Sequence, residues 1–238
     1  MRNRSKGLTL PELLPGTLLK RYKRFLADIK LESGELITAH CPNSGSMTSR
    51  SEPGRCVYVS VQDRPERKLK YTWEIIEMPT SLVGINTLVP NRLVYQSLMT
   101  GQIHGFDEYD TIKTEVRVGR HSRLDIMLSN VHGKQCYMEI KNCTLVDDGI
   151  AYFPDAITTR GRNHLIILED LAAAGNRSVM FFLIQRMDAK FFRPADHVDP
   201  AYGKQLRKAN ASSVEIIIYD VKIDLQKICL GKRIPYQL

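Results

Sequence analysis

The chain has 238 residues, enough for one large domain or two smaller ones with a sizeable core. Hydrophobic residues make up 43% and charged residues 25%, which is typical of a globular protein and excludes a disordered or fibrous chain. The formal net charge of +8 favours a polyanionic partner, nucleic acid first and an anionic membrane surface second, although a basic charge can also serve solubility alone.

Cysteine usage and the N-terminal segment bear on the compartment. The five cysteines include no C-x-x-C pair, which argues against a disulfide framework or a zinc knuckle and fits a reducing cytoplasm. Pro11, Glu12 and Pro15 interrupt the first apolar stretch, which makes it a poor signal peptide. No run approaches the roughly 18 apolar residues that a membrane span needs. We expect a soluble, cytoplasmic protein, with its oligomeric state left open.

Residues 1–84 are predicted to form a small β-barrel. The candidate strands, separated by turn residues and polar loops, are 18–31, 35–41, 55–62, 71–78 and 81–86. An oligonucleotide-binding (OB) barrel is the natural candidate, although other small barrels share this pattern. This part holds 14 Lys and Arg against 9 Asp and Glu, so it carries +5 of the net +8.

One segment of this barrel combines cations with aromatic rings, as single-strand binding surfaces do. Its cations are Lys20, Arg21, Lys23 and Arg24, interleaved with Tyr22 and Phe25. A charged barrel strand without this function would look the same. The polar loop at 43–46 offers backbone N–H groups that can nest a phosphate, or it is a plain turn.

Residues 85–238 are predicted to form a second domain. We expect a helix within 86–101 that ends at Gly101, and a second from Asp155 to Ala174 with Asp155 as its N-cap. A short helix is expected around 201–210. The expected strands are 111–118, 122–129, 134–142, 178–186 and 214–223. This order predicts a mixed sheet with flanking helices, and a mixed α+β protein as a whole.

Acidic residues collect on successive strands of this sheet. Glu139 and Lys141 are two residues apart on one strand, so they share a face, opposite the apolar face of the strand. Asp125 lies on the preceding strand and Glu115 on the one before it. Carboxylates hold Mg²⁺ or Mn²⁺, the metal activates water, and a nearby lysine can orient that water or stabilise the phosphorane. The alternative is an ordinary Glu–Lys ion pair on a solvated face.

The sequence also resembles a known family. The stretches that carry the likeness, from about residue 18 almost to the C-terminus, are "RYKRFLADI", "HCPNSGSMT", "SRLDIML", "CYMEIKNCTL" and "AYFPDAITTRGRNHLIILEDL". They are similar to the sugar fermentation stimulation protein A (SfsA) family. The resemblance implies an OB-like domain followed by a PD-(D/E)xK nuclease fold. It also implies DNA binding, with a proposed role in regulating sugar-utilisation genes.

The resemblance also implies roles for the acidic set. Asp125, Glu139 and Lys141 take the motif's three positions as the catalytic residues. Asp125 and Glu139 would hold the metal, and Glu115 fits the additional acid that some of these nucleases use. The residue before Asp125 is Leu124, where the motif has proline; this departure leaves the metal chemistry untouched.

Two functions of different classes therefore stay open: a non-catalytic DNA-binding factor, and a Mg²⁺-dependent nuclease acting on DNA or RNA. Arg160 and His164 stand four apart on the predicted helix after the acidic strand and project together. They would meet a phosphate or a base edge, or else form a solvated helix face.

Overall fold

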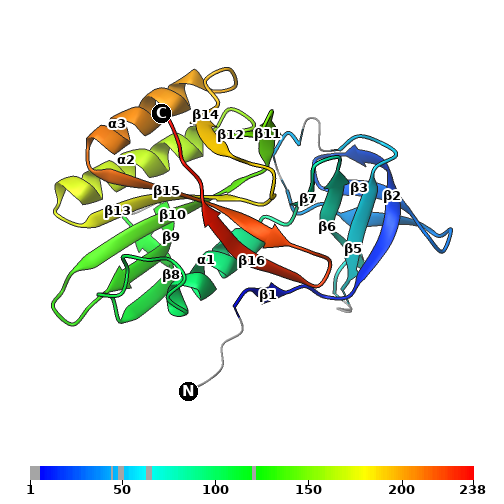
Figure 1. Ribbon diagram of the computed structural model, residues 1–238, viewed down its shortest axis with the longest axis horizontal. Coiled ribbons are helices and arrows are strands. Elements are labelled where there is room, and N and C mark those ends of the chain that lie inside the picture. The colour runs from blue at the N-terminus through cyan, green and yellow to red at the C-terminus, as the bar shows by residue number, and fades with distance from the viewer. Residues whose placement is uncertain (1–5, 44, 48–50, 63–65, 120–121) are drawn as a thin grey trace.

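The computed structural model describes residues 6–43, 45–47, 51–62, 66–119 and 122–238. The N-terminal part forms a β-barrel, and beside it lies a larger mixed sheet with helices on both faces (Figure 1). The mixed α+β fold with an N-terminal OB-like barrel, predicted from the sequence, is confirmed. No helix in the described part of the chain is long and apolar enough to cross a membrane.

The barrel closes on itself. Its strands are β2 (Leu13–Tyr22), β3 (Leu26–Leu31), β4 (Leu36–His40), β5 (Cys56–Val61) and β6 (Tyr71–Met78). They pair in the order β4-β3-β2-β5-β6, and a parallel pairing of β4 with β6 closes the ring. The interior is filled by alternating apolar side chains such as Leu18, Ile29 and Trp73, all fully buried. β7 (Ser81–Gly84) pairs with β6 and leads to the second domain.

The basic segment predicted as a single strand over 18–31 is a hairpin instead. β2 ends at Tyr22, and the turn at 23–25 returns the chain into β3. Lys23 and Arg24 have φ values of 50° and 63°, a region that Gly and Asn adopt most readily. Because the turn contains neither residue, the sequence carries no turn signal there, and the prediction was wrong.

The larger sheet has the strand order β1-β16-β15-β13-β10-β9-β8. In chain order these are β1 (Leu8–Thr9), β8 (Thr111–Val118), β9 (Ser122–Ser129), β10 (Gln135–Cys143), β13 (Arg177–Ile184), β15 (Val214–Ile223) and β16 (Lys227–Arg233). β10, β13 and β15 run parallel, and their neighbours run antiparallel. β1 precedes the barrel yet pairs with β16 in this sheet, so the domain division at residue 84 stays a prediction.

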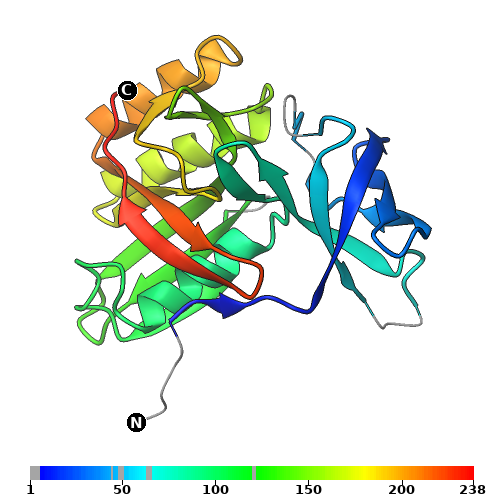
Figure 2. The ribbon, with the colours of Figure 1, turned by 45° about the vertical axis from the view of Figure 1, so that its right-hand side comes forward.

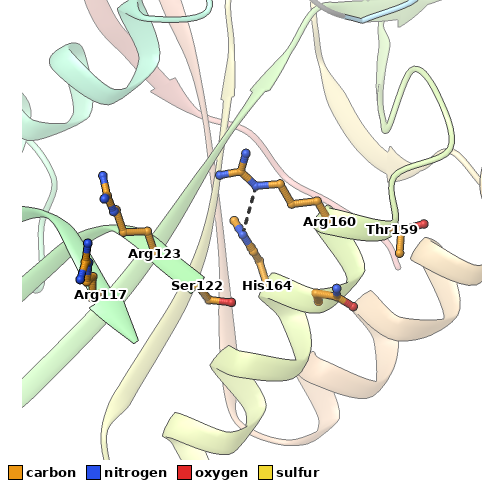
Figure 3. Close-up of a pocket in the computed structure, with 7 residues that line it drawn as sticks. Arg117, Ser122, Arg123, Thr159, Arg160 and His164 are labelled. Carbon is orange, nitrogen blue, oxygen red and sulfur yellow. Dashed lines mark hydrogen bonds between the residues drawn. The ribbon is translucent and has the colours of Figure 1, made fainter. Parts of the chain in front are cut away.

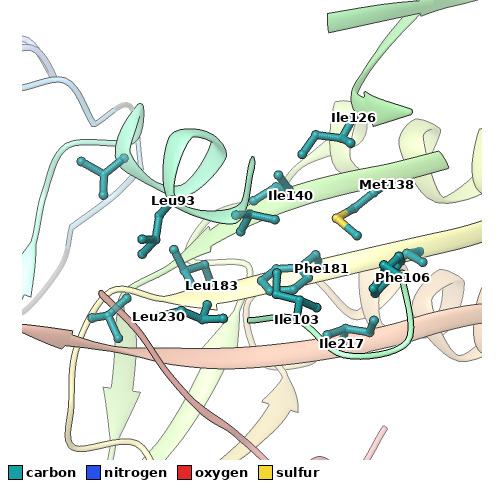
Figure 4. Close-up of a cluster of buried hydrophobic side chains, with 14 of the residues drawn as sticks. Leu93, Ile103, Phe106, Ile126, Met138, Ile140, Phe181, Leu183, Ile217 and Leu230 are labelled. Atoms are coloured by element: carbon teal, nitrogen blue, oxygen red, sulfur yellow. The ribbon is translucent and has the colours of Figure 1, made fainter. Parts of the chain in front are cut away.

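Helices cover both faces of this sheet (Figure 2). α1 (Val89–Met99) packs on one face, where Leu93 joins Ile126, Met138 and Phe181 in a buried cluster (Figure 4). α2 (Thr159–Ala173) and α3 (Pro200–Ala211) pack on the other. β13 is buried along almost its whole length because it lies between these two layers.

The chain between β10 and α2 departs from the prediction. It forms β11 (Leu145–Asp147) and β12 (Ile150–Phe153), and β12 pairs with β14 (Phe191–Pro194) in a small third sheet. α2 starts at Thr159, and its N-cap is Thr158, whose side chain accepts a hydrogen bond from the Gly161 N–H. Asp155 as N-cap was therefore wrong; both residues suit a cap, and only the backbone path decides between them.

Candidate functional site

The hairpin of β9 and β10 opens at Asp125. The register of its strands ends at Met138 and Ile126, and the residues that follow this last pair are Glu139 on β10 and Asp125 on β9. There the Asp125 side chain, and not a backbone carbonyl, bonds to the facing strand: its Oδ2 accepts a hydrogen bond from the Ile140 N–H at 2.7 Å. Its Oδ1 accepts a hydrogen bond from Asn91 of α1, also at 2.7 Å. Two donors from different elements therefore fix the orientation of this carboxylate.

Glu139 is the buried centre of the site, with an exposed fraction of 3%. Its Oε1 accepts a hydrogen bond from Lys141 Nζ at 2.5 Å and contacts Nδ1 of His164. Cys136, Met138 and Ile140 face the opposite core, so Glu139 and Lys141 share a face as predicted. Oε2 of Glu139 has no hydrogen-bond partner within the described part of the chain. Such an unsatisfied buried oxygen is costly unless another group binds it.

The two carboxyl groups titrate differently. Burial, and then the neighbouring charge of Glu139, raise the pKa of Asp125 to about 6. Burial also raises the pKa of Glu139, but the hydrogen bond from His164 and the positive charge of Lys141 outweigh it and hold that pKa below its usual value. Glu139 is therefore ionised at neutral pH, while Asp125 takes up a proton in mildly acidic solution.

The donor set fits a divalent cation only in part. Two carboxylates belong to adjacent strands, and one of their oxygens, Oε2 of Glu139, has no hydrogen-bond partner among the described residues. Glu115, with a φ of 53°, stands on β8 between the register pairs Thr114–Ile126 and Val116–Leu124. It lines a small cavity of about 230 Å³ together with Asp125, but its carboxylate is 3.6 Å from Arg123. Among the described residues, no three His, Cys, Asp or Glu side chains converge as a ready-made metal cluster. The metal-ligating roles thus stay predictions.

A basic cavity of about 790 Å³ lies beside this carboxylate pair, between the β8–β9 hairpin and α2 (Figure 3). We call it the arginine groove; its lining residues are Arg117, Ser122, Arg123, Thr159, Arg160, Asn163 and His164. Arg160 Nε lies 3.5 Å from Nε2 of His164, so the predicted Arg160–His164 pair does come together. His164 in turn touches Glu139, which connects the groove to the buried carboxylate.

Sequence reasoning missed Arg117 and Arg123. These residues are register partners on β8 and β9, so their side chains stand opposite each other. The signal was present in the sequence "RVGRHSR", residues 117–123, where basic residues flank Gly119. Cations close together at a predicted strand turn are common, so they indicate an anion-binding groove only once it is known that a helix faces them.

The predicted basic residues of the barrel differ in their contacts, and their nucleic-acid-binding role stays a prediction. Lys20 pairs with Asp28 at 3.3 Å and lies over the Tyr22 ring, and Lys23 lines none of the cavities described here. Arg21 donates hydrogen bonds to the carbonyls of Asn43, Gly45 and Ser46, at 2.8, 3.0 and 3.1 Å. Arg21 thus holds the 43–46 loop through three of its backbone carbonyls. Ser44 of this loop lies outside the described residues.

A second cavity, of about 570 Å³, lies between the barrel and the larger sheet. We call it the interdomain cavity. Arg21, Arg24 and the loop residues Asn43, Gly45 and Ser46 line it from the barrel. Asn142 and Thr144, at the carboxyl end of β10, and the segment Phe153–Thr158 line it from the other side. Thr158 borders this cavity and Thr159 borders the arginine groove, so the start of α2 separates the two.

Comparison with known proteins gives consistent matches. The family model described as "SfsA N-terminal OB domain" matches residues 19–85, and "Sugar fermentation stimulation protein RE domain" matches residues 88–227. A sugar fermentation stimulation protein homolog of Geotalea uraniireducens is 51% identical, covering 87% of this chain and 89% of its own. The homolog of Acidithiobacillus ferrooxidans is 46% identical, and the match covers 96% of this chain and 99% of that homolog.

A solved structure has the same fold. It is described as "The structure of Pyrococcus Furiosus SfsA in complex with Ca2+", and it matches with a TM-score of 0.90 at 24% identity, covering 98% of this chain and 100% of that chain.

Proposed function

This chain belongs to the sugar fermentation stimulation protein (SfsA) family, and we propose that it binds DNA by holding the phosphate backbone in the arginine groove. One observation carries the proposal: Arg117, Arg123 and Arg160 line the same cavity, and none of its described lining residues is acidic, although Arg123 also has the Glu115 carboxylate at 3.6 Å. Guanidinium groups bind phosphate oxygens in pairs of parallel hydrogen bonds. Contacts of this kind position a protein on DNA without reading its sequence, and they would underlie a regulatory role in sugar utilisation.

The net charge supports the same partner. Each phosphate contact releases counterions from DNA, so affinity falls steeply as salt rises, by about 0.9 log units per contact for each log unit of salt. The test is a salt series of fluorescence-anisotropy titrations with a labelled DNA fragment. Binding that weakens with salt in the wild type and weakens further in Arg160→Gln supports the proposal. Absence of binding at about 50 mM salt overturns it.

A second candidate function is divalent-metal-dependent hydrolysis of the bound backbone. It is favoured by Oε2 of Glu139, which has no hydrogen-bond partner in the part of the chain that the structure describes, by the Asp125 carboxylate on the adjacent strand, and by Lys141 within hydrogen-bond reach of Glu139. Asp125 and Glu139 would hold the ion. A bound Mg²⁺ or Mn²⁺ would supply an activated water and neutralise charge on the phosphate. Ca²⁺, the ion in the Pyrococcus structure, also prefers oxygen ligands.

The protein's own residues would do the rest. The arginine groove would position the backbone, and Lys141 would stabilise the negative charge that develops on the phosphate. His164 contacts both Glu139 and Arg160, so it would orient the carboxylate toward the ion while coupling it to the groove. Incubation of plasmid, linear and single-stranded DNA with and without Mg²⁺ or Mn²⁺ tests this candidate. Cleavage that needs the ion supports it, and intact DNA under all conditions excludes it.

A further inference from the structure

The interdomain cavity has no part in the backbone contacts proposed above. We infer that it receives an unpaired nucleobase, so that the protein selects single-stranded DNA over duplex. The inference rests on the proposed DNA binding and names the form of DNA that the same site takes. Its volume of about 570 Å³ is that of a pocket for a small organic ligand, and its lining comes from both domains.

The position of the cavity suits a ligand. It lies outside the carboxyl end of β10, which runs parallel to β13 and β15, and binding crevices form at this edge of parallel sheets. Consecutive residues at the start of α2 line the two cavities, Thr158 this one and Thr159 the arginine groove. A strand with one phosphate in the groove would therefore carry its neighbouring base to the mouth of the cavity.

The lining matches the chemistry of a base. The amide oxygens of Asn43 and Asn142 already accept hydrogen bonds from the Gly45 N–H, at 2.9 Å, and from Gln185, at 2.8 Å, so these two side chains offer their NH₂ groups as donors to the acceptor atoms of a base edge. The Thr144 hydroxyl can donate or accept, and the Thr87 hydroxyl, which donates to the Pro42 carbonyl at 2.6 Å, can still accept. Ile157, 76% exposed at the rim, offers an apolar side chain to the flat face of a base. Arg24, at the tip of the β2–β3 hairpin, supplies a cation for the accompanying phosphate.

The cavity walls are held in place before any ligand binds. Three hydrogen bonds from Arg21 fix the carbonyls of the barrel loop. The same loop is joined to the second domain, because Ser46 Oγ donates to the Asp155 carbonyl at 2.7 Å. A Cβ at Gly45 would lie 2.6 Å from an Asp155 carboxylate oxygen, so a larger residue there would force the Asp155 side chain to move. A preorganised pocket binds without first paying for loop ordering.

The preference for single strands follows from access. In a duplex, bases show only their edges in the grooves, so a base can enter a pocket only after it is unpaired and unstacked. A single strand has no pairing to break. We therefore expect single-stranded DNA to bind at least about tenfold more tightly than a duplex of the same sequence and length.

A matched pair of variants tests this in the full-length protein, with EDTA present so that no strand is cut. Arg24→Asn and Lys23→Asn remove one positive charge each from the same turn, both at positive φ, where asparagine is tolerated. Only Arg24 lines the cavity. Arg24→Asn should lower the affinity for a labelled single-stranded 20-mer several-fold more than that for the duplex. Lys23→Asn should lower both equally, leaving their ratio unchanged.

A second pair obstructs the cavity directly. Ala156→Glu places a charged side chain at the exposed rim, whereas Ala201→Glu adds the same charge on exposed α3, where it lines neither cavity. Ala156→Glu should reduce the single-strand preference, and Ala201→Glu should keep it, with equal thermal unfolding of both. A wild type that binds duplex as tightly as single strands overturns the base pocket but leaves groove binding standing. A wild type that binds neither overturns the proposed function with it.

Discussion

Arg117 and Arg123 are direct cross-strand partners on β8 and β9, and both line the arginine groove. Like charges placed opposite each other in a sheet destabilise it by roughly 0.2–1 kcal/mol. A phosphate bound between them would relieve that repulsion. Because Arg123 also has the Glu115 carboxylate at 3.6 Å, Arg117 is the arginine whose neutralisation should weaken DNA binding without lowering stability.

For Arg117→Gln, we expect DNA affinity to fall several-fold and the slope of log affinity against log salt to shrink by about 0.9. The midpoint of thermal unfolding should stay the same or rise. Lys222→Gln is the control, because Lys222 is an exposed strand residue that lines neither cavity, and it should leave the slope nearly unchanged. An Arg117 variant that loses stability and keeps its affinity would remove this arginine from the interface.

Replacing the adjacent barrel cations Lys20 and Arg21 should lower stability by different amounts. Arg21→Ala removes three hydrogen bonds to loop carbonyls, and hydrogen bonds to charged groups contribute about 1.5–3 kcal/mol each. We expect a loss on the order of 2 kcal/mol or more in denaturant unfolding. Lys20→Ala breaks an exposed ion pair with Asp28, which is worth about 0–1 kcal/mol. Equal effects of the two changes would contradict the structural role of Arg21.

Asp125 should make stability depend on pH. Its pKa of about 6 in the folded protein lies above the ordinary value of 3.8, so the folded state binds the proton more tightly than the unfolded state. Stability contributed by the protonated form is therefore lost as pH rises from about 4 to about 6, by on the order of 2 to 3 kcal/mol. Above about pH 6, Asp125 is ionised, and the free energy of unfolding is lowered by the full cost of burying its charge.

Asp125→Asn removes the free-energy cost of burying this negative charge. The Asn91 side-chain amide now donates a hydrogen bond to Asp125, and after a flip of the amide its oxygen can accept one from the new asparagine. The variant should be more stable than the wild type at pH 7.5, and the difference should shrink at pH 4.5. Urea unfolding at the two pH values measures it. A difference that is independent of pH would mean that Asp125 does not titrate in this window.

Substitutions at Asp125, Glu139 and Lys141 distinguish a metal site from a purely structural ion pair. Asp125→Ala and Glu139→Ala should each abolish Mg²⁺ or Mn²⁺ binding in calorimetric titration, because one protein carboxylate holds these ions weakly. DNA affinity without metal should persist or increase, since each change removes a negative charge near the phosphates. Lys141→Ala keeps both carboxylates, so the ion should still bind while any cleavage fails.

The alternative is that Glu139 and Lys141 form an ion pair with a structural role only. In that case, loss of Lys141 leaves Glu139 buried with fewer partners and lowers stability, while metal affinity is absent in the wild type as well. A wild type that binds neither ion, even with DNA present, leaves DNA binding as the function of the site.

Periodic patterns along the chain made much of the fold predictable. Alternation along β10 placed Met138 in the core and Glu139 with Lys141 on the opposite face, because side-chain direction in a strand follows from local geometry alone. For the same reason, the sequence predicted α1 and β13, whose residues from Val179 to Ile184 are all apolar. It also placed Asp125 next to Glu139, since a hairpin with a short turn brings its strands into register.

Tertiary structure alone decided what surrounds these residues. His164 reaches Glu139 because α2 docks on one particular face of the sheet, and a helical period says which residues share a face but not what that face meets. That Arg21 holds the 43–46 loop could not be read from the sequence, because its partners are main-chain carbonyls that carry no sequence signature; its role in nucleic-acid binding stays a prediction. The interdomain cavity arises where Gly45 meets Asp155, and contacts between segments that distant depend on the packing of both domains.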